Sequence, residues 1–188
     1  MTRALLVIDM QRGFDDLDFW GPTANLPACE RNVAALVSAW ERRDEPIVVV
    51  RHDSLSPASP LHPSHPGNAL VDAVAEVDAA LSVSKNVNSA FYGTPDLHAW
   101  LRERGIEEVV VCGIQTNMCV ETTARMAGNL GYEVTVALDA TRTFDLRAEI
   151  PGLGEVTRAA ADLMASAALE LQAGGFARIV TTAELAGD

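Results

Sequence analysis

The sequence predicts an α/β protein with three layers, in which helices cover both faces of a parallel β-sheet. Short apolar runs rich in Val and Ile alternate along the chain with longer segments of helical periodicity, and this alternation is typical of parallel sheets joined by right-handed crossovers. Most of these runs are continuous and rich in β-branched residues and do not alternate apolar with polar residues, which indicates strands buried on both faces. With 188 residues, 48% of them hydrophobic, we expect a single domain over residues 1–188.

Six segments are expected to form parallel strands. They are residues 4–8, 47–50, 81–85, 109–112, 134–138 and 177–180, with 81–85 the weakest candidate. If these strands lie in the order 3-2-1-4-5-6, the order reverses between the first strand and the fourth. Open parallel sheets form their ligand sites at such a reversal, outside the carboxyl ends of the strands.

Four segments between the strands are expected to form helices, namely 28–43, 94–104, 119–130 and 155–173. The second of them is expected to have Thr94 as its N-cap and Pro95 at its first helical position. One long irregular segment, residues 54–68, holds four prolines. Loops of that length in a compact domain are usually functional or mobile, and the sequence leaves open whether this one closes over a site.

Charge and composition argue against several classes of protein. Fourteen basic against 26 acidic side chains give a net charge of −12, whereas a protein that binds nucleic acid or an anionic membrane needs a basic face. No apolar stretch is long enough to span a membrane, and no export signal is evident. Three cysteines are too few for a disulfide scaffold, so we expect a cytoplasmic protein.

Three chemically different side chains occupy matching positions after predicted strands. Asp9, Lys85 and Cys119 place a carboxylate, an ammonium and a thiol at the carboxyl ends of the first, third and fourth strands. Each has an ordinary structural alternative, because Asp9 could cap a turn, Lys85 could be a surface lysine and Cys119 could be a packed core cysteine. Together at one edge of a sheet, they predict a site for acid–base and nucleophilic chemistry.

Cys119 has the setting of a reactive thiol. It lies at the start of a predicted helix, where free backbone N–H groups and the helix dipole favour the thiolate, and a nearby lysine adds to this effect. The same N–H groups can bind an oxyanion. Cys112, inside an apolar strand, is expected to be an inert buried thiol, and Cys29 has no comparable setting.

No metal and no cofactor are expected. His62 and His65 lie three residues apart in the proline-rich segment, but no cysteine or carboxylate at a suitable spacing completes a metal site. His52 ends a strand and is more easily explained as part of a pocket. The sequence leaves open whether any of these three histidines binds a metal. It contains neither a glycine-rich phosphate-binding motif nor the G-x-S-x-G motif of serine hydrolases.

Three stretches together resemble the isochorismatase-like cysteine hydrolase superfamily. They read LVIDMQ at residues 6–11, KNVNSAF at 85–91 and GIQTNMCVETTA at 113–124, in the family's order and at its spacing. The resemblance implies a Rossmann-like fold with six parallel strands in the order 3-2-1-4-5-6. It also implies that Asp9, Lys85 and Cys119 form the catalytic triad.

The resemblance has two further implications. A cis peptide bond is expected between Ile114 and Gln115, and it would turn the Gln115 N–H toward the Cys119 N–H to form an oxyanion hole. Members of the superfamily are often oligomeric, so we expect a homo-oligomer, either a dimer or a tetramer.

Two features narrow the expected chemistry. Nicotinamidases of the superfamily hold a metal with an Asp-x-His pair after the second strand; here Asp53 matches the aspartate, but Leu55 stands where the histidine would be. Isochorismatases commonly lack the cysteine, because hydrolysis of a vinyl ether needs no thiol nucleophile. Cys119 therefore indicates cleavage of a C–N bond.

The sequence thus predicts a cysteine hydrolase that cleaves a C–N bond of a small amide, ureido or lactam substrate through a thioester on Cys119. Its pocket is expected to be small and largely apolar, with His52 or Arg142 able to bind a polar or anionic end of the substrate. The expected lining residues are Phe14, Trp20, His52, Phe91, Tyr92, Ile114, Met118 and Arg142.

Three alternatives stay open at this point. A vinyl-ether hydrolase of the isochorismatase type would use Asp9 and Lys85 and would not need Cys119. A redox protein would use Cys119 as a peroxide-reactive thiol. A non-catalytic binding or assembly subunit would tolerate the loss of all three side chains.

Overall fold

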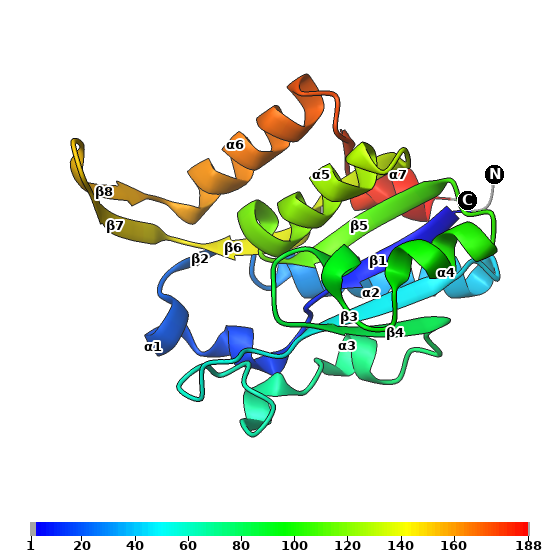
Figure 1. The fold of residues 1–188 in the computed structure, drawn as a ribbon, viewed down its shortest axis with the longest axis horizontal. Coiled ribbons are helices and arrows are strands. Elements are labelled where there is room, and N and C mark those ends of the chain that lie inside the picture. The colour runs from blue at the N-terminus through cyan, green and yellow to red at the C-terminus, as the bar shows by residue number, and fades with distance from the viewer. Residues whose placement is uncertain (1–2, 188) are drawn as a thin grey trace.

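The computed structural model describes residues 3–187 and has a central sheet with helices on both faces (Figure 1). The parallel strands are β1 (Arg3–Ile8), β3 (Ile47–His52), β4 (Leu81–Lys85), β5 (Glu108–Ile114), β6 (Glu133–Phe144) and β9 (Arg178–Val180). Side by side, they follow one another as β4, β3, β1, β5, β6 and β9. The predicted α/β class is confirmed. Met1, Thr2 and Asp188 of the predicted domain lie outside the described residues.

The sheet has one strand more than predicted. The short strand β2 (Thr23–Ala24) pairs antiparallel with Thr143 and Phe144, the last residues of β6, and β6 is therefore much longer than the predicted segment 134–138. No sequence pattern marks β2, because two residues are too few to show a period. The extra length of β6 brings Phe144 to the edge of the sheet where the pocket lies.

Both faces of the sheet are buried, and β1 shows how. Leu5 and Val7 belong to one apolar cluster, whereas Leu6 and Ile8 belong to the other, because successive side chains of a strand point to opposite faces. The first cluster includes residues of α2 (Ala28–Arg42), α3 (Asp72–Ala75) and α7 (Thr182–Ala186), and the second includes residues of α4 (Leu97–Glu103), α5 (Glu121–Asn129) and α6 (Ala160–Ala173).

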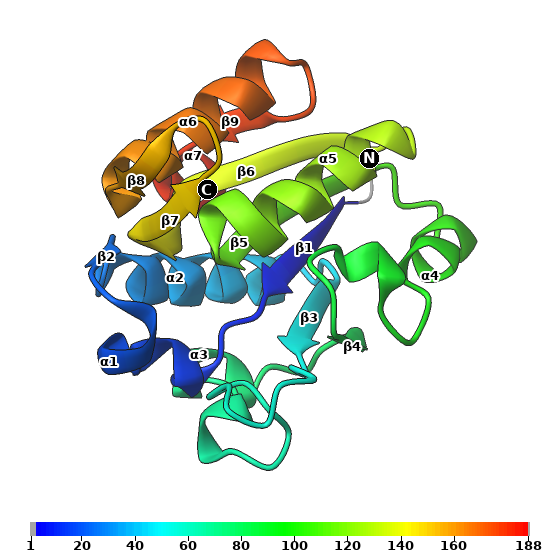
Figure 2. The ribbon, with the colours of Figure 1, turned by 60° about the vertical axis from the view of Figure 1, so that its left-hand side comes forward.

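The predicted helix over residues 155–173 is wrong in its first turn. Residues 154–158 form the strand β8 (Gly154–Arg158), which pairs with β7 (Leu146–Ile150), and α6 begins only at Ala160. The β7–β8 hairpin stands away from the body of the protein (Figures 1 and 2). Val156 and Thr157 are β-branched, and Gly152 and Gly154 have positive φ at the turn, so both favour a hairpin over a helix.

Two other helices also begin away from their predicted ends. The helix expected at Thr94 begins at Leu97, and its N-cap is Asp96, whose carboxylate accepts a hydrogen bond from the Ala99 N–H at 3.0 Å. Thr94 instead exchanges backbone hydrogen bonds with Ser84. The helix expected over 119–130 begins with a turn of π-helix, Thr116–Val120, and continues as α5. The other short helices are α1 (Leu17–Trp20) and the 3-10 helices Arg12–Asp15, Pro66–Asn68 and Ala90–Tyr92.

Within residues 3–187, no helix combines the length and the apolar character needed to cross a bilayer. The cytoplasmic location and the homo-oligomer expected from the sequence stay predictions.

Gly113 of β5 is a position where the sheet leaves no room for a side chain. Its φ is +115°, and an added Cβ would lie 2.0 Å from the Ile8 carbonyl oxygen. We expect Gly113→Ala to lower the free energy of unfolding by ~3 kcal/mol or more, about 1–2 kcal/mol of it from the strained φ and the rest from the clash with the backbone. Urea titration of the purified variant measures this loss.

Gly131→Ala is the matched control for this experiment. The φ of Gly131 is +92°, but nothing lies within 4 Å of an added Cβ, so only the φ strain applies. Equal losses of stability in the two variants would contradict the packing argument.

Candidate active site

The three side chains predicted to form the site meet at the carboxyl edge of the sheet. Asp9 directly follows β1, Lys85 is the last residue of β4, and Cys119 lies in the π-helix after β5. The Nζ of Lys85 lies 2.6 Å from Asp9 Oδ2 and 3.4 Å from Cys119 Sγ. The ammonium of Lys85 therefore contacts both the carboxylate of Asp9 and the thiol of Cys119.

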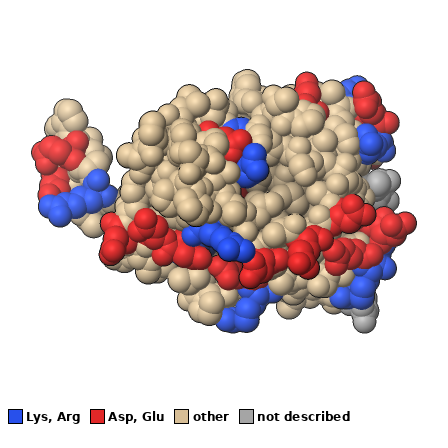
Figure 3. Space-filling view, turned by 90° about the horizontal axis from the view of Figure 1, so that it is seen from below, with Lys and Arg blue, Asp and Glu red and all other residues tan. Residues whose placement is uncertain are grey.

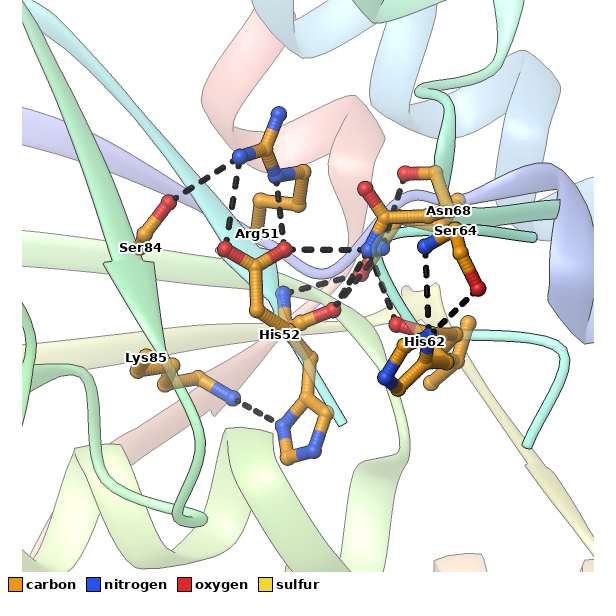
Figure 4. A network of polar contacts seen from close by, with 10 residues as sticks. Arg51, His52, His62, Ser64, Asn68, Ser84 and Lys85 are labelled. Atoms are coloured by element: carbon orange, nitrogen blue, oxygen red, sulfur yellow. Dashed lines mark hydrogen bonds and ion pairs between the residues drawn. The ribbon is translucent and has the colours of Figure 1, made fainter. Parts of the chain in front are cut away.

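The strand order explains how Lys85 reaches the other two side chains. β4 is separated from β1 by β3, and Lys85 is in register with His52, the last residue of β3. The lysine side chain passes over the end of β3, where the histidine ring also lies (Figure 4). A long, flexible side chain suits this position, because it has to span the width of one strand.

Lys85 and Asp9 form an ion pair without contact with solvent, since neither side chain has any exposed area. Burial raises the pKa of Asp9, and the ammonium of Lys85 opposes this rise. The second carboxylate oxygen, Oδ1, is buried without a hydrogen-bond partner among the described residues. An unpaired buried acceptor costs free energy, and here it is an oxygen able to accept a proton close to the thiol.

Burial opposes the thiolate that the sequence context of Cys119 favours. Burial and the neighbouring Asp9 carboxylate raise the pKa of the Cys119 thiol to about 12, and the opposing effect of Lys85 is smaller. The residue lies within a buried turn of π-helix and is only 7% exposed. At neutral pH the sulfur is a thiol that needs a base. Cys112, fully buried in β5, also has a raised pKa, as expected of an inert thiol.

His52 completes the group around the ammonium. Its Nδ1 lies 3.2 Å from Lys85 Nζ, and Figure 4 shows the lysine side chain pointing toward the ring. Burial and Lys85 lower the pKa of His52 to about 4, so the ring is neutral at pH 7. Because an ammonium can only donate hydrogen bonds, Nδ1 is the acceptor and Nε2 carries the ring proton.

The backbone of His52 is held by the side chain of Gln11. Gln11 Nε2 donates to the His52 carbonyl at 3.0 Å, and Gln11 Oε1 accepts from the His52 N–H at 2.9 Å. Asn68 donates to the same carbonyl at 3.2 Å and to the Leu61 carbonyl at 2.8 Å. These two amides therefore tie the proline-rich segment to the end of β3. Gln11 is part of the LVIDMQ stretch at residues 6–11, but nothing in the sequence predicted a role for it.

A cavity of about 300 Å³ reaches Cys119. It is lined by Phe14, Trp20, His52, Leu61, Asn88, Gln115, Met118, Cys119, Phe144, Asp145 and Leu146. Four of the predicted lining residues are therefore present: Phe14, Trp20, His52 and Met118. The sequence did not indicate Leu61, Asn88, Phe144, Asp145 and Leu146, because they come from the proline-rich segment and from loops and strand ends whose course depends on the tertiary fold.

Three predicted lining residues lie away from this cavity. Phe91 stacks on Tyr132, with ring centroids 6.0 Å apart, because its short 3-10 helix packs toward the helical layer. Tyr92 is 70% exposed and is not among the residues that line the cavity. Ile114 is buried in the core, at the end of β5.

Arg142, predicted to bind a polar or anionic end of the substrate, does not line this cavity either. Its side chain is buried, pairs with Asp15 at 2.7 Å and donates to the carbonyl of Phe14 at 2.8 Å. The remaining nitrogen, Nε, donates to the Thr23 hydroxyl at 3.1 Å, and the guanidinium lies 5.1 Å from the ring centre of Phe144. The guanidinium therefore stabilises the packing of the residues beside the pocket.

Gln115 brings a backbone donor to the cavity. The peptide bond between Ile114 and Gln115 is cis, at the position that the resemblance implies. Within residues 3–187 the Gln115 N–H donates to no acceptor, and it is therefore available to a ligand. The Gln115 carbonyl accepts from the N–H groups of Met118 and Val120, both at 3.1 Å, and these bonds hold the turn that carries Cys119.

The donors at the triad do not fit a metal ion. Asp9, His52 and Cys119 each place a donor atom within 4.8 Å of the others. The ammonium of Lys85 contacts all three side chains, however, and a second cation there would meet strong repulsion. Lys85 therefore supplies the positive charge of this cluster.

The residues around Asp53 do not fit a metal ion either. Leu55, at the position of the metal-binding histidine, is 77% exposed and has no donor atom. Asp53 accepts a hydrogen bond from Asn68 at 3.0 Å. The Nδ1 atoms of His62 and His65 make hydrogen bonds inside their own loop, to Ser64 and to the Gly67 N–H, and Figure 4 shows the first of these.

Known proteins are similar to this chain in sequence and in fold. The sequence model of the isochorismatase domain matches residues 3–183. The isochorismatase family protein YrdC of Bacillus subtilis (strain 168) is 37% identical over 77% of this chain and 76% of its own length. Nicotinamidase 3 of Arabidopsis thaliana is 34% identical over 76% of this chain and 74% of its own length. A solved structure from Chromobacterium violaceum, assigned to the isochorismatase family, has a TM-score of 0.87 at 38% identity, covering 98% of this chain and 92% of the other.

These similarities and the α/β fold define the class of the protein as a hydrolase. The chain belongs to the isochorismatase family. The resemblance noted in the sequence is thereby confirmed across almost the whole chain.

The charge balance at the triad predicts how Cys119 reacts with alkylating agents. We expect Asp9→Asn to speed the reaction of Cys119 with iodoacetamide at pH 7.5. The carboxylate raises the pKa of the thiol and Lys85 lowers it, so loss of the carboxylate leaves the ammonium to stabilise a thiolate. Each unit by which the thiol pKa falls raises the thiolate fraction about tenfold. The rate is followed by intact mass spectrometry.

Lys85→Met is the opposite variant and is expected to slow alkylation, and Cys119→Ala identifies the labelled residue. An Asp9→Asn protein that retains its circular-dichroism spectrum but reacts no faster than the wild type would contradict this assignment of charges.

Proposed function

We propose that this protein is a cysteine hydrolase that cleaves a C–N bond of a small amide, ureido or lactam substrate through a thioester on Cys119. The observation that carries the proposal is the contact of Lys85 with both Asp9 and Cys119, at 2.6 and 3.4 Å, next to a cavity that Cys119 lines. A protonated thiol next to a carboxylate of raised pKa suits a reaction in which the carboxylate takes the thiol proton and later returns it. Similarity to a protein named nicotinamidase 3 supports amide chemistry.

In the acylation half of the proposed reaction, Asp9 accepts the proton of Cys119 as the sulfur attacks the carbonyl carbon and forms a C–S bond. Lys85 stabilises the negative charge shared by the carboxylate and the sulfur. The Gln115 and Cys119 N–H groups are the proposed donors to the oxyanion, and each such donor typically contributes ~3–4 kcal/mol to transition-state stabilisation. The C–N bond then breaks, and Asp9 transfers its proton to the leaving nitrogen.

In the deacylation half, water replaces the released ammonia or amine. Asp9 takes a proton from that water, and the resulting hydroxide attacks the thioester carbon. The C–S bond breaks, the product leaves as a carboxylic or carbamic acid, and Asp9 returns the proton to the sulfur. The resting thiol and carboxylate are restored, so one residue serves as base and acid in turn.

His52 is proposed to orient Lys85 and to offer a neutral donor to the substrate. Its Nδ1 accepts from the ammonium, which leaves the Nε2 proton for a ligand in the cavity that the ring lines. A neutral donor can bind a carbonyl oxygen at neutral pH without adding a second positive charge beside Lys85.

Cys119→Ala is expected to lower the release of ammonia from small amides by on the order of 10⁴-fold or more, because no other group takes over a lost nucleophile. With the wild type, intact mass spectrometry shortly after mixing should show an acyl adduct that is absent in Cys119→Ala. Cys29→Ala removes a buried thiol away from the cavity and serves as the control.

Two results of the same screen would overturn the thioester route. Hydrolysis that survives in Cys119→Ala would point to the vinyl-ether type of chemistry, which needs only Asp9 and Lys85. Binding of small amides without turnover in the wild type would point to a non-catalytic subunit.

Chelation is expected to leave hydrolysis unchanged, because Lys85 supplies the positive charge that a metal would otherwise provide. The measurement compares the rate before and after dialysis against EDTA. A loss of activity that Zn²⁺ or Mn²⁺ restores would contradict this prediction.

A further inference from the structure

The cavity at Cys119 carries one negative charge and no positive charge on its lining. Among the described residues that line the cavity, Asp145 is the one acidic side chain, there is no lysine or arginine, and the lowered pKa of His52 leaves its ring neutral. Lys85 is buried behind the cavity and is neutralised by Asp9. Arg142, the cation expected to bind an anionic end of the substrate, is paired with Asp15. A bound molecule therefore meets Asp145 without a neighbouring cation to balance it.

The Asp145 carboxylate is held in place and still has an oxygen to offer. Its Oδ1 accepts the N–H of Ala160 at 2.8 Å, and its own N–H donates to the Pro22 carbonyl at 2.8 Å. Within residues 3–187 no lysine, arginine or histidine forms an ion pair with it. The carboxylate is thus positioned by the start of α6 and is free to pair with a ligand.

Aromatic rings form another part of the same wall. Phe14, Trp20 and Phe144 pack together, with ring centroids 5.0, 5.5 and 5.9 Å apart, and the Trp20 indole N–H is fixed on the Gly13 carbonyl at 2.8 Å. Aromatic faces attract cations and apolar groups and do not stabilise a carboxylate. A carboxylate combined with aromatic rings is a recognised arrangement for an ammonium or similar cation.

The overall charge acts in the same direction. The chain has a net charge of −12, and Figure 3 shows a band of mainly acidic side chains, interrupted by basic ones, across the face that it presents. A negative field of this kind raises the local concentration of cationic ligands and lowers that of anionic ones.

We propose that Asp145 is a specificity-determining residue, which makes the pocket select amides that carry a positive charge away from the scissile bond and reject amides that carry a carboxylate. The selection among amide substrates rests on the hydrolase function proposed above. The selection by charge is a property of the cavity and does not depend on that function.

The first test measures charge selection without needing a substrate. Cys119 is modified with methanethiosulfonates that carry a trimethylammonium, a sulfonate or a neutral methyl group, and each rate is divided by the rate of the same reagent with free glutathione. In the wild type the cationic reagent is expected to be favoured over the anionic one by about tenfold, the effect of one charge at short range in a partly shielded site. In Asp145→Asn the ratio should fall toward one.

Asn is the matched substitution, because its Oδ1 can still accept the N–H of Ala160, and thermal unfolding checks that α6 is intact. Asp139→Asn is the control variant. Asp139 also accepts a helical N–H, from Thr182 at 2.7 Å, and carries the same charge, but it does not line the cavity. An equal change of the ratio in both variants, or no change in Asp145→Asn, would overturn the proposal.

The second test compares kcat/KM for benzamide, 4-(aminomethyl)benzamide and 4-carboxybenzamide in the wild type and Asp145→Asn. The cationic amide is expected to be preferred by the wild type and to lose about tenfold of that preference in the variant. If the first test shows charge selection but no amide is hydrolysed in a Cys119-dependent way, the proposed function is contradicted and the proposed selectivity is not. Hydrolysis with the same order of preference in the wild type and in Asp145→Asn would contradict the proposed selectivity and leave the proposed function intact.

Discussion

The buried ion pair between Lys85 and Asp9 is the constraint on which the rest of the site depends. Moving each charge out of water costs several kcal/mol, which only close pairing and further hydrogen bonds can offset. The pair meets this demand with a 2.6 Å contact and with His52 and Cys119 as further neighbours of the ammonium. To do so, the lysine side chain has to reach across β3. Gln11 holds the end of that strand by hydrogen bonds to both the N–H and the carbonyl of His52.

The same burial sets the chemistry of the sulfur. Many reactive cysteines are ionised in advance by a helix terminus or a nearby cation, but here the Asp9 carboxylate and the lack of solvent keep Cys119 protonated in the resting state. The sulfur and the carboxylate then share one proton under the field of Lys85. In the proposed reaction the sulfur therefore becomes ionised only when Asp9 takes its proton.

The parts of the site that follow strands could be predicted, and those that depend on long-range packing could not. Asp9 comes directly after an apolar run and Lys85 ends the third predicted strand, so their shared edge follows from parallel pairing alone. Arg142 shows the limit of this reasoning, because its guanidinium turns into the wall and binds Asp15, 127 residues away. Asp145 and Phe144 were missed because β6 continues far beyond its apolar segment and is extended by pairing with β2.

The sequence by itself determined the class of fold, the family and the three side chains that meet, because these depend on local periodicity and on residues at the ends of strands. Only the tertiary structure decided the protonation of Cys119, the position of Arg142 and the β7–β8 hairpin in place of a helical turn. The physical reason is the same in each case. Burial, ion pairing and strand pairing join residues far apart in the chain, and a local pattern carries no information about a partner that folding alone brings near.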